Sequence, residues 1–289
     1  MRLSHWSYAV VVGLCLGTAG SKALAAGPPL APDMVNALES LQQRLQDDGA
    51  SQDEIDDAKA AARRLQGGNA ADRWARVLFL QLAATGEARR GRDGAAADLY
   101  RQARRIDGVD GDSRRRWLDQ EARLRLRAGQ TAQGAELLGE WIERHGGDRD
   151  SLWLMAQAQA TLEHWSQAAN WVDRARRAGG MNDTRRALAA SVYQHAERYE
   201  AALGLLDTAL EGKGDDPDAW RRAAALAQRM QRHGLAAALW EAGWRRGALQ
   251  GREALEQLIR LHVAGGTPAR AAEYQQAAFE DGSLPRDVE

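Results

Sequence analysis

The fold is decided by two stretches of sequence that repeat each other. Residues 164–175 read HWSQAANWVDRA, and residues 198–209 read RYEAALGLLDTA. When the second stretch is laid on the first, 34 residues apart, small and apolar residues coincide: Ala168 with Ala202, Val172 with Leu206, and Ala175 with Ala209. A fixed period of this length indicates a chain built from stacked supersecondary units.

The same spacing continues on both sides of these stretches. One further step of 34 reaches Ala236 and Trp240, and a copy displaced by one extra residue contains Ala271 and Ala278. Glycine pairs at 146–147 and 179–180, and an Asp-Pro step at 216–217, mark helix ends and a helix start. We therefore predict five helix pairs: 113–128 with 131–145, 150–163 with 166–178, 183–196 with 199–211, 217–231 with 235–246, and 252–264 with 268–281.

These spacings and residue classes resemble the tetratricopeptide (TPR) repeat. The resemblance implies an all-α fold, a right-handed TPR-type α-solenoid of antiparallel helix pairs, each made of a helix A and a helix B. A small residue at the crossing, such as Ala156 or Ala168, lets the two helix axes approach to about 8 to 10 Å. Trp165, Tyr199 and Trp240 are expected to fill the space between neighbouring pairs.

The N-terminal third is predicted to be helical but less regular. Ser51 and Glu54 form a capping box before a helix that runs to about residue 66, and an amphipathic helix precedes it. Residues 74–84 and 94–106 should form a further pair, joined by an Arg- and Gly-rich connection too long for the TPR consensus. We therefore divide the chain into irregular helical pairs at 26–110 and a TPR solenoid at 111–289.

Charge is unevenly spread along this N-terminal third. Residues 33–57 are acidic, and residues 63–127 are rich in arginine. We interpret both stretches as solvated helix faces; the alternative is an acidic tip and a basic flank that orient a partner.

Residues 1–25 have the composition of an export signal. Arg2 gives a positive start, residues 8–19 form an apolar core, and residues 23–25 read Ala-Leu-Ala, a small-x-small cleavage site. We therefore expect a periplasmic protein released by cleavage, with a retained anchor as the alternative. The single cysteine, Cys15, lies inside this segment, so the mature chain should have no disulfide and no thiol ligand or nucleophile.

Composition and motifs argue against nucleic-acid binding and catalysis. The chain has 39 basic and 40 acidic residues, and removal of the signal takes away two of the basic ones, Arg2 and Lys22. The remaining chain has slightly more acidic than basic residues, whereas a general nucleic-acid binder has an excess of basic ones. The sequence has no His-Glu-x-x-His pattern, no phosphate-binding glycine loop and no nucleophile elbow. Because helix pairs account for nearly all of residues 26–289, we expect no enzymatic activity, no metal and no cofactor.

By the TPR resemblance, helix A lines a concave face that offers side chains to a protein or an extended peptide. The positions that point into this face carry an aromatic ring, glutamines and arginines in this chain. The candidate partner-binding residues are Trp153, Gln157, Gln194, Arg221, Gln228, Arg229 and Arg260. The arginines would form a cationic strip for a carboxylate-bearing peptide, with Trp153 as an aromatic anchor. The alternatives are a solvated face for the arginines and a core position between repeats for Trp153.

The C-terminal block carries a narrower resemblance. Residues 253–261 read EALEQLIRL, residues 264–272 read AGGTPARAA, and residues 282–286 read GSLPR. This order is similar to the periplasmic TPR proteins that accompany TonB, ExbB and ExbD energy-transduction systems. The resemblance implies a periplasmic scaffold for a TonB-type outer-membrane transport system, which meets the membrane only through its partners. The alternative is a TPR module for envelope polysaccharide export or periplasmic protein maturation.

The last residues are similar to the start of another helix A. Residues 285–289 read PRDVE, and nothing follows them. We therefore expect the last repeat to be truncated and the last helix pair to expose an apolar edge.

Overall fold

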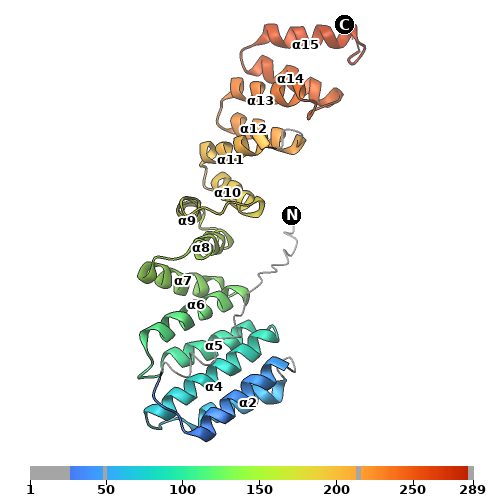
Figure 1. Cartoon of the computed structure of the whole chain (residues 1–289). Coiled ribbons are helices and arrows are strands. Elements are labelled where there is room, and N and C mark those ends of the chain that lie inside the picture. Colours follow the sequence, from blue (N-terminus) through green and yellow to red (C-terminus); the bar gives the residue numbers. More distant parts are fainter. Residues whose placement is uncertain (1–26, 48–50, 213–215, 286–289) are drawn as a thin grey trace. The chain divides into compact units, whose positions relative to one another are not determined.

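The computed structural model describes residues 27–47, 51–212 and 216–285, and every regular element in these ranges is an α-helix. The chain forms two compact units, Met1–Gly146 and Gly147–Glu289. In both units consecutive helices pack as antiparallel pairs, which is the TPR-type α-solenoid that the repeat predicts (Figure 1). The predicted division at residue 110, between irregular helical pairs and regular repeats, stays a prediction. The predicted signal at residues 1–25 lies outside the described residues.

The first unit begins with two helices that lead into two TPR-like pairs. The capping box is confirmed, since the Ser51 hydroxyl accepts a hydrogen bond from the Glu54 N–H at 3.3 Å and the Ser51 N–H donates to the Glu54 carboxylate at 3.0 Å. Apolar residues at 38, 41, 45 and 55 join the core of this unit. Its helices are α2 (Pro32–Asp47), α3 (Gln52–Arg64), α4 (Ala70–Arg89), α5 (Asp93–Arg104), α6 (Gly111–Arg127) and α7 (Thr131–His145).

The long connection predicted between residues 84 and 94 is wrong. Helix α4 continues to Arg89, and only three residues separate it from α5. Gly86 lies so close to α3 that an added Cβ would stand 2.6 Å from a carbon of Ile55. The next residue, Glu87, is buried and forms ion pairs with Lys59 of α3 and with Arg92. The glycine and the charges that resembled a loop are therefore packing and ion-pairing residues of a helix.

A buried ion cluster joins α5 to α6. Glu121, 1% exposed, lies 2.6 Å from Arg104 of α5 and 3.3 Å from Arg125 on its own helix. Arg125, 4% exposed, also reaches Asp98 of α5 at 2.9 Å. Because each buried charge has an opposite partner, the cluster holds the two helices together without leaving an uncompensated ion.

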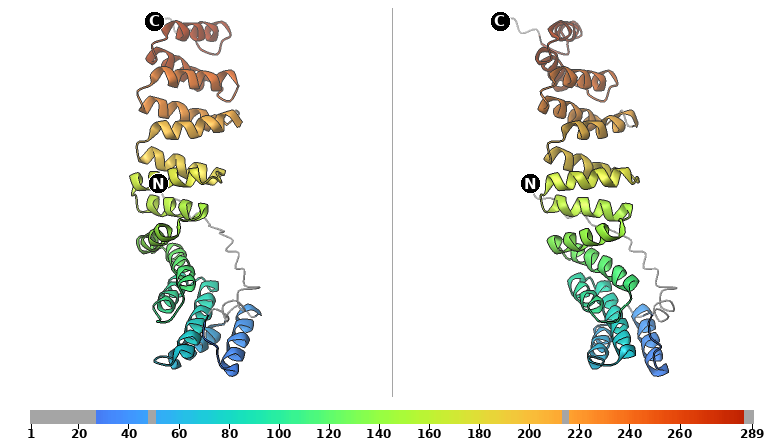
Figure 2. Two further views of the ribbon diagram at one scale, coloured as in Figure 1. Left: turned by 60° about the vertical axis from the view of Figure 1, so that its left-hand side comes forward. Right: turned by 90° about the vertical axis from the view of Figure 1, so that its left-hand side faces the viewer.

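The second unit contains the regular repeats, stacked in chain order (Figures 1 and 2). All five predicted pairs are present, the first of them as α6 and α7 of the first unit and the other four in the second unit. Each helix boundary agrees with the prediction to within two residues. The helices are α8 (Arg149–Thr161), α9 (Trp165–Arg177), α10 (Asp183–His195), α11 (Tyr199–Gly212), α12 (Pro217–Arg229), α13 (His233–Arg245), α14 (Arg252–Ala264) and α15 (Pro268–Glu280). Helices α8, α10, α12 and α14 are helices A, and the others are helices B.

The packing roles predicted for the two alanines and the two tryptophans are confirmed, and the role predicted for Tyr199 stays a prediction. Ala156 and Ala168, the predicted crossing residues, are both fully buried. Trp240 of α13 donates its indole N–H to the Ala254 carbonyl of α14 at 2.9 Å, so this ring bridges two neighbouring pairs. Trp165 of α9 likewise stacks on His195 of α10, with ring centroids 4.1 Å apart.

The prediction of an apolar edge on the last helix pair is wrong for the described residues. Ala169 and Val172 are fully buried in α9, which has α8 and α10 as neighbours, whereas their counterparts on α15, Ala272 and Gln275, are exposed. The outward face of α15 therefore carries small and polar side chains. Among the residues that the structure describes, Val263 is the large hydrophobic side chain that stands out as exposed.

Each A-to-B turn has the same hydrogen-bonded form. The N–H of the residue before helix B donates to a carbonyl five residues back, as from His164 to Gln159 at 2.9 Å and from Arg232 to Ala227 at 2.9 Å. This bond belongs to a Schellman motif, which places the preceding residue in the left-handed region. Glycine fills that position in some repeats, including Gly129, but three repeats place Glu163, Glu197 and Gln231 there with φ of 59°, 58° and 58°.

Replacing Gln231 by glycine should raise the free energy of unfolding by about 0.5 to 1 kcal/mol, because glycine adopts positive φ without a Cβ penalty. Urea unfolding followed by far-UV circular dichroism measures this change. The matched control is Gly129→Ala, which should lower the free energy of unfolding by about 1 kcal/mol. The cause would be the positive φ by itself, since no atom lies within 4 Å of the added Cβ. A Gln231→Gly protein no more stable than the parent would contradict the interpretation.

Candidate protein-interaction surface

The seven predicted partner-binding residues lie on α8, α10, α12 and α14, one helix A in each successive layer of the second unit. Arg221, Gln228, Arg229 and Arg260 are exposed, and Gln157 and Gln194 are half-buried. Six of the seven side chains therefore reach the surface. The structure spreads them over four layers rather than gathering them in one pocket, which is the distribution that an extended ligand requires.

Trp153 does not present an aromatic surface, because it is only 4% exposed. Arg185 of α10 lies over its ring, with 5.7 Å between the guanidinium carbon and the ring centroid. The same arginine forms an ion pair with Asp150 of α8 at 2.6 Å. Trp153 thus lies in the interior between α8 and α10, as the alternative interpretation of this residue predicted. The Arg185 guanidinium that pairs with Asp150 also covers the ring.

The predicted cationic strip is partly balanced by acidic neighbours on the same helices. Arg221 pairs with Asp218 at 3.0 Å, and Arg260 lies 3.9 Å from Glu256 and donates to Gln257 at 2.9 Å. Exposed ion pairs of this kind contribute about 0 to 1 kcal/mol, so a carboxylate from a partner can compete for these arginines. The surface is therefore not a strip of free positive charge.

Helix α10, which carries Gln194, is held on α9 by a buried tyrosine. Tyr193 is fully buried and donates its hydroxyl proton to Asp173 at 2.5 Å, while Arg176 donates to the hydroxyl oxygen at 3.2 Å. Arg198 pairs with the other oxygen of Asp173 at 2.9 Å. Burial, reinforced by the hydrogen bond to Asp173, raises the pKa of Tyr193 above its ordinary value. This cluster fixes the end of α10 next to Gln194.

Helix α14, which carries Arg260, is held by a second cluster at Glu241. The Glu241 carboxylate of α13 accepts hydrogen bonds from Arg270 at 2.7 Å and from the Tyr274 hydroxyl at 2.8 Å, both on α15. Its second oxygen lies 3.4 Å from a ring nitrogen of His262 on α14, and that ring stacks on Tyr274. Three helices therefore meet at one carboxylate.

The pKa of Glu241 reflects two opposing effects. Burial favours the neutral acid, but the hydrogen bonds from Arg270 and Tyr274, together with the charge of Arg245 at 2.7 Å, outweigh burial and hold the pKa below its ordinary value. The carboxylate is therefore ionised at neutral pH. Asp173 occupies the same repeat position two units of 34 residues earlier, so the repeat reuses one acidic position as an anchor.

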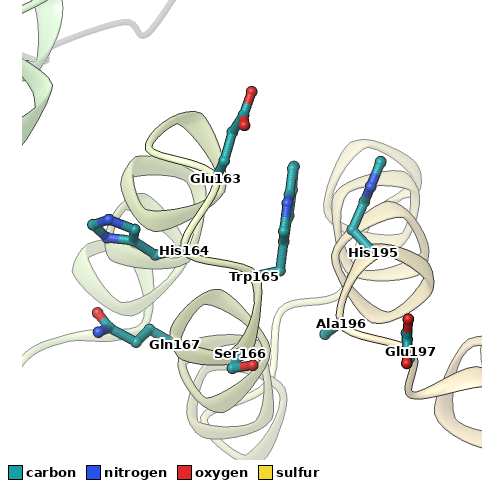
Figure 3. A pocket seen from close by; sticks show the side chains of 8 residues that line it. All are labelled: Glu163, His164, Trp165, Ser166, Gln167, His195, Ala196 and Glu197. Atoms are coloured by element: carbon teal, nitrogen blue, oxygen red, sulfur yellow. The ribbon is translucent and has the colours of Figure 1, made fainter.

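A hollow with a volume of about 480 Å³ opens beside the A-to-B turns of two repeats (Figure 3). Trp165 and His195 form its centre as a stacked pair, 4.1 Å between centroids and 16° between planes. Glu163 and Glu197 are exposed at its two sides. Sequence reasoning placed Trp165 between repeats but missed the hollow; glutamate at a turn position where other repeats have glycine was the available signal.

The described residues contain neither a metal-binding cluster nor a membrane-spanning helix. No group of three or more His, Cys, Asp or Glu side chains is arranged to hold a metal ion in the described part of the chain. None of the helices in residues 27–47, 51–212 and 216–285 combines the length and the apolar character needed to span a membrane.

No protein-family model and no curated protein matches the chain. Solved structures of low similarity include MamA of strain MSR-1, with 16% identity and a TM-score of 0.45 over 59% of this chain and 95% of that one. MamA from Desulfovibrio magneticus RS-1 has 17% identity and a TM-score of 0.38 over 66% and 97%. A tetratricopeptide repeat protein from Parabacteroides merdae has 15% identity and a TM-score of 0.48 over 87% and 95%.

Because the pKa of Glu241 is depressed in the folded state, its stabilisation is complete above the unfolded-state value of about 4.3 and is lost as pH falls through the folded value. Glu241→Gln should lower the free energy of unfolding by about 1 to 2 kcal/mol at pH 7. The difference from wild type should shrink as the pH is lowered to about 3, which urea titrations across this range would measure. Glu253→Gln, at an exposed position on α14, is the matched control. A difference that does not change with pH would contradict the assignment.

Proposed function

We propose that this chain is a scaffold that binds an extended segment of a partner protein along helices A of its second unit. The observation that carries this proposal is the recurrence of accessible glutamine and arginine side chains on α8, α10, α12 and α14. Stacked repeats create long binding surfaces because each layer adds the same face at the next position.

The chemistry of these side chains suits an extended peptide. Gln157, Gln194 and Gln228 each offer an amide that both donates and accepts hydrogen bonds, which matches the alternating groups of a peptide backbone. Arg221, Arg229 and Arg260 add cations that bind carboxylates with paired hydrogen bonds. The surface therefore favours an extended segment that carries acidic side chains or a free carboxyl end.

The helices that present these residues are held in fixed positions. The Tyr193–Asp173 contact locks α10 on α9, and the Glu241 cluster locks α14 between α13 and α15. A surface whose helices are already placed loses less conformational entropy on binding than one that must be ordered. This rigidity supports a role in binding.

The more specific part of the proposal is a periplasmic location and association with a TonB-type outer-membrane transport system. It is supported by the export-signal composition of residues 1–25 and by the similarity of residues 253–286 to TPR proteins that accompany TonB, ExbB and ExbD. In this proposal the chain meets the membrane only through these partners.

The groove assignment is tested with Arg221→Glu/Arg260→Glu. We expect it to weaken binding of the purified periplasmic segments of TonB or ExbD by about tenfold or more, because two charge-assisted contacts become repulsive. Isothermal titration calorimetry gives the affinity, and far-UV circular dichroism checks the helices. Arg144→Glu/Arg177→Glu changes the net charge equally on helices B, and should bind as wild type does. Equal affinity in the groove variant would overturn the assignment.

The TonB association is tested by cross-linking in cells, followed by purification of the tagged full-length chain and mass spectrometry of the bound proteins. We expect TonB, ExbB or ExbD to be recovered with wild type and depleted with Arg221→Glu/Arg260→Glu. Recovery of other envelope proteins in a groove-dependent manner, without these three, would overturn the TonB association while leaving the scaffold proposal intact.

A further inference from the structure

The hollow beside Trp165 uses none of the seven candidate residues on helices A, although His195, which lines it, directly follows Gln194 at the end of α10. It is formed where α8 ends, α9 begins and α10 ends. Figure 3 shows the rings of Trp165 and His195 standing face to face, with Glu163 on the other side of the Trp165 ring. Glu197 lies below and to the right of His195 in the same view. One face of the indole is therefore covered by the imidazole, and Glu163 lies on the side of its other face.

The two glutamates occupy backbone positions that favour glycine. Glu163 and Glu197 have φ of 59° and 58°, and the corresponding position holds Gly129 in the preceding repeat and Gln231 in the following one. A non-glycine residue in this conformation carries a cost of about 1 kcal/mol. Of these four turns, only the two that border the hollow carry a carboxylate, which places negative charge on both sides of the aromatic pair.

The charge on the two glutamates is not cancelled by their surroundings. The hollow is bordered by the carboxyl ends of α8 and α10, where the helix dipole is negative, and by the first residues of α9, where it is positive, so the helix ends largely offset one another. The neighbouring cation, Arg198, is turned away, since it pairs with Asp173 at 2.9 Å and donates to Asn170 at 2.7 Å. The carboxylates of the hollow are thus not neutralised by this arginine.

The same unit shows how an arginine binds to tryptophan. Arg174 lies over the ring of Trp171 at 4.1 Å, and Arg185 lies over Trp153 at 5.7 Å while pairing with Asp150. A planar guanidinium can stack on an indole face and still donate two hydrogen bonds to a carboxylate beside the ring. The hollow places the same two kinds of group, an indole and a carboxylate, at an accessible surface.

We propose that the hollow at Trp165, His195, Glu163 and Glu197 binds an arginine side chain from a segment of a partner protein. The guanidinium stacks on the open face of Trp165 and donates hydrogen bonds to Glu163, while Glu197 adds attraction from the side of His195. This site complements the candidate residues on helices A (α8, α10, α12 and α14), which are proposed to bind acidic groups. A partner with a basic residue next to an acidic extended segment would use both.

The probe is the blocked peptide Ac-Gly-Gly-Arg-Gly-Gly-NH2, titrated into the ¹⁵N-labelled full chain and followed by NMR of the tryptophan indole N–H signals. Trp165→Phe identifies the Trp165 signal by its disappearance. The comparison peptide replaces arginine by citrulline, which has nearly the same shape without the charge. We expect a saturable shift of the Trp165 signal with the arginine peptide and at least tenfold weaker binding of the citrulline peptide.

The variant is Glu163→Gln/Glu197→Gln. Glutamine is compatible with this backbone, as Gln231 shows in the next repeat, so the fold should be retained. We expect arginine binding to weaken about tenfold. The control, Glu136→Gln/Glu253→Gln, removes two exposed carboxylates that do not line the hollow, and should bind as wild type does.

Three results would overturn the proposal. The first is equal binding of the arginine and citrulline peptides, and the second is unchanged affinity in Glu163→Gln/Glu197→Gln. The third is a dimer of this chain in sedimentation velocity that the double variant abolishes, because a second copy would then be the occupant. None of these results depends on Arg221 or Arg260, so failure here is distinct from failure of the helix-A surface.

Discussion

The close crossing of the two helices in each pair is the constraint on which the rest of the structure depends. Ala156 and Ala168 are fully buried at this crossing, where a larger side chain would push the axes apart. Each pair is thin and cannot bury its apolar face alone, so it relies on the next pair for a partner surface. Each recurrence of the alanines along the sequence therefore corresponds to one further helix pair in the stack.

Buried polar groups share with the apolar core the task of joining neighbouring helices. Glu121 with Arg104 and Arg125 joins α5 to α6, and Glu241 joins α13 to α14 and α15. Hydrogen bonds and ion pairs require a specific geometry, whereas alanine contacts tolerate sliding. These clusters thus fix the register between the helices that they join.

The helix pairs of the second unit were predictable because their boundaries depend on local signals: a period of 34 residues, Gly pairs and an Asp-Pro start. The segment after residue 84 was misjudged because Gly86 and Glu87 have local signals of a loop but make long-range contacts with Ile55 and Lys59. Trp153 shows the same limit. Its helix position was predicted correctly, but Arg185, 32 residues later, covers its ring.

The sequence by itself determined the all-helical repeat, the helix bounds of the second unit and the surface positions of six of the seven candidate residues, because helix periodicity is written into each short segment. Only the tertiary structure decided which aromatic ring is buried and which is available. Trp153 and Trp165 are alike as residues, yet an arginine from the next repeat covers one, while the other stacks on His195 at an open hollow between two carboxylates. That difference arises from the side chains that neighbouring repeats bring to each ring, and such contacts across layers leave no trace in the local pattern of either segment.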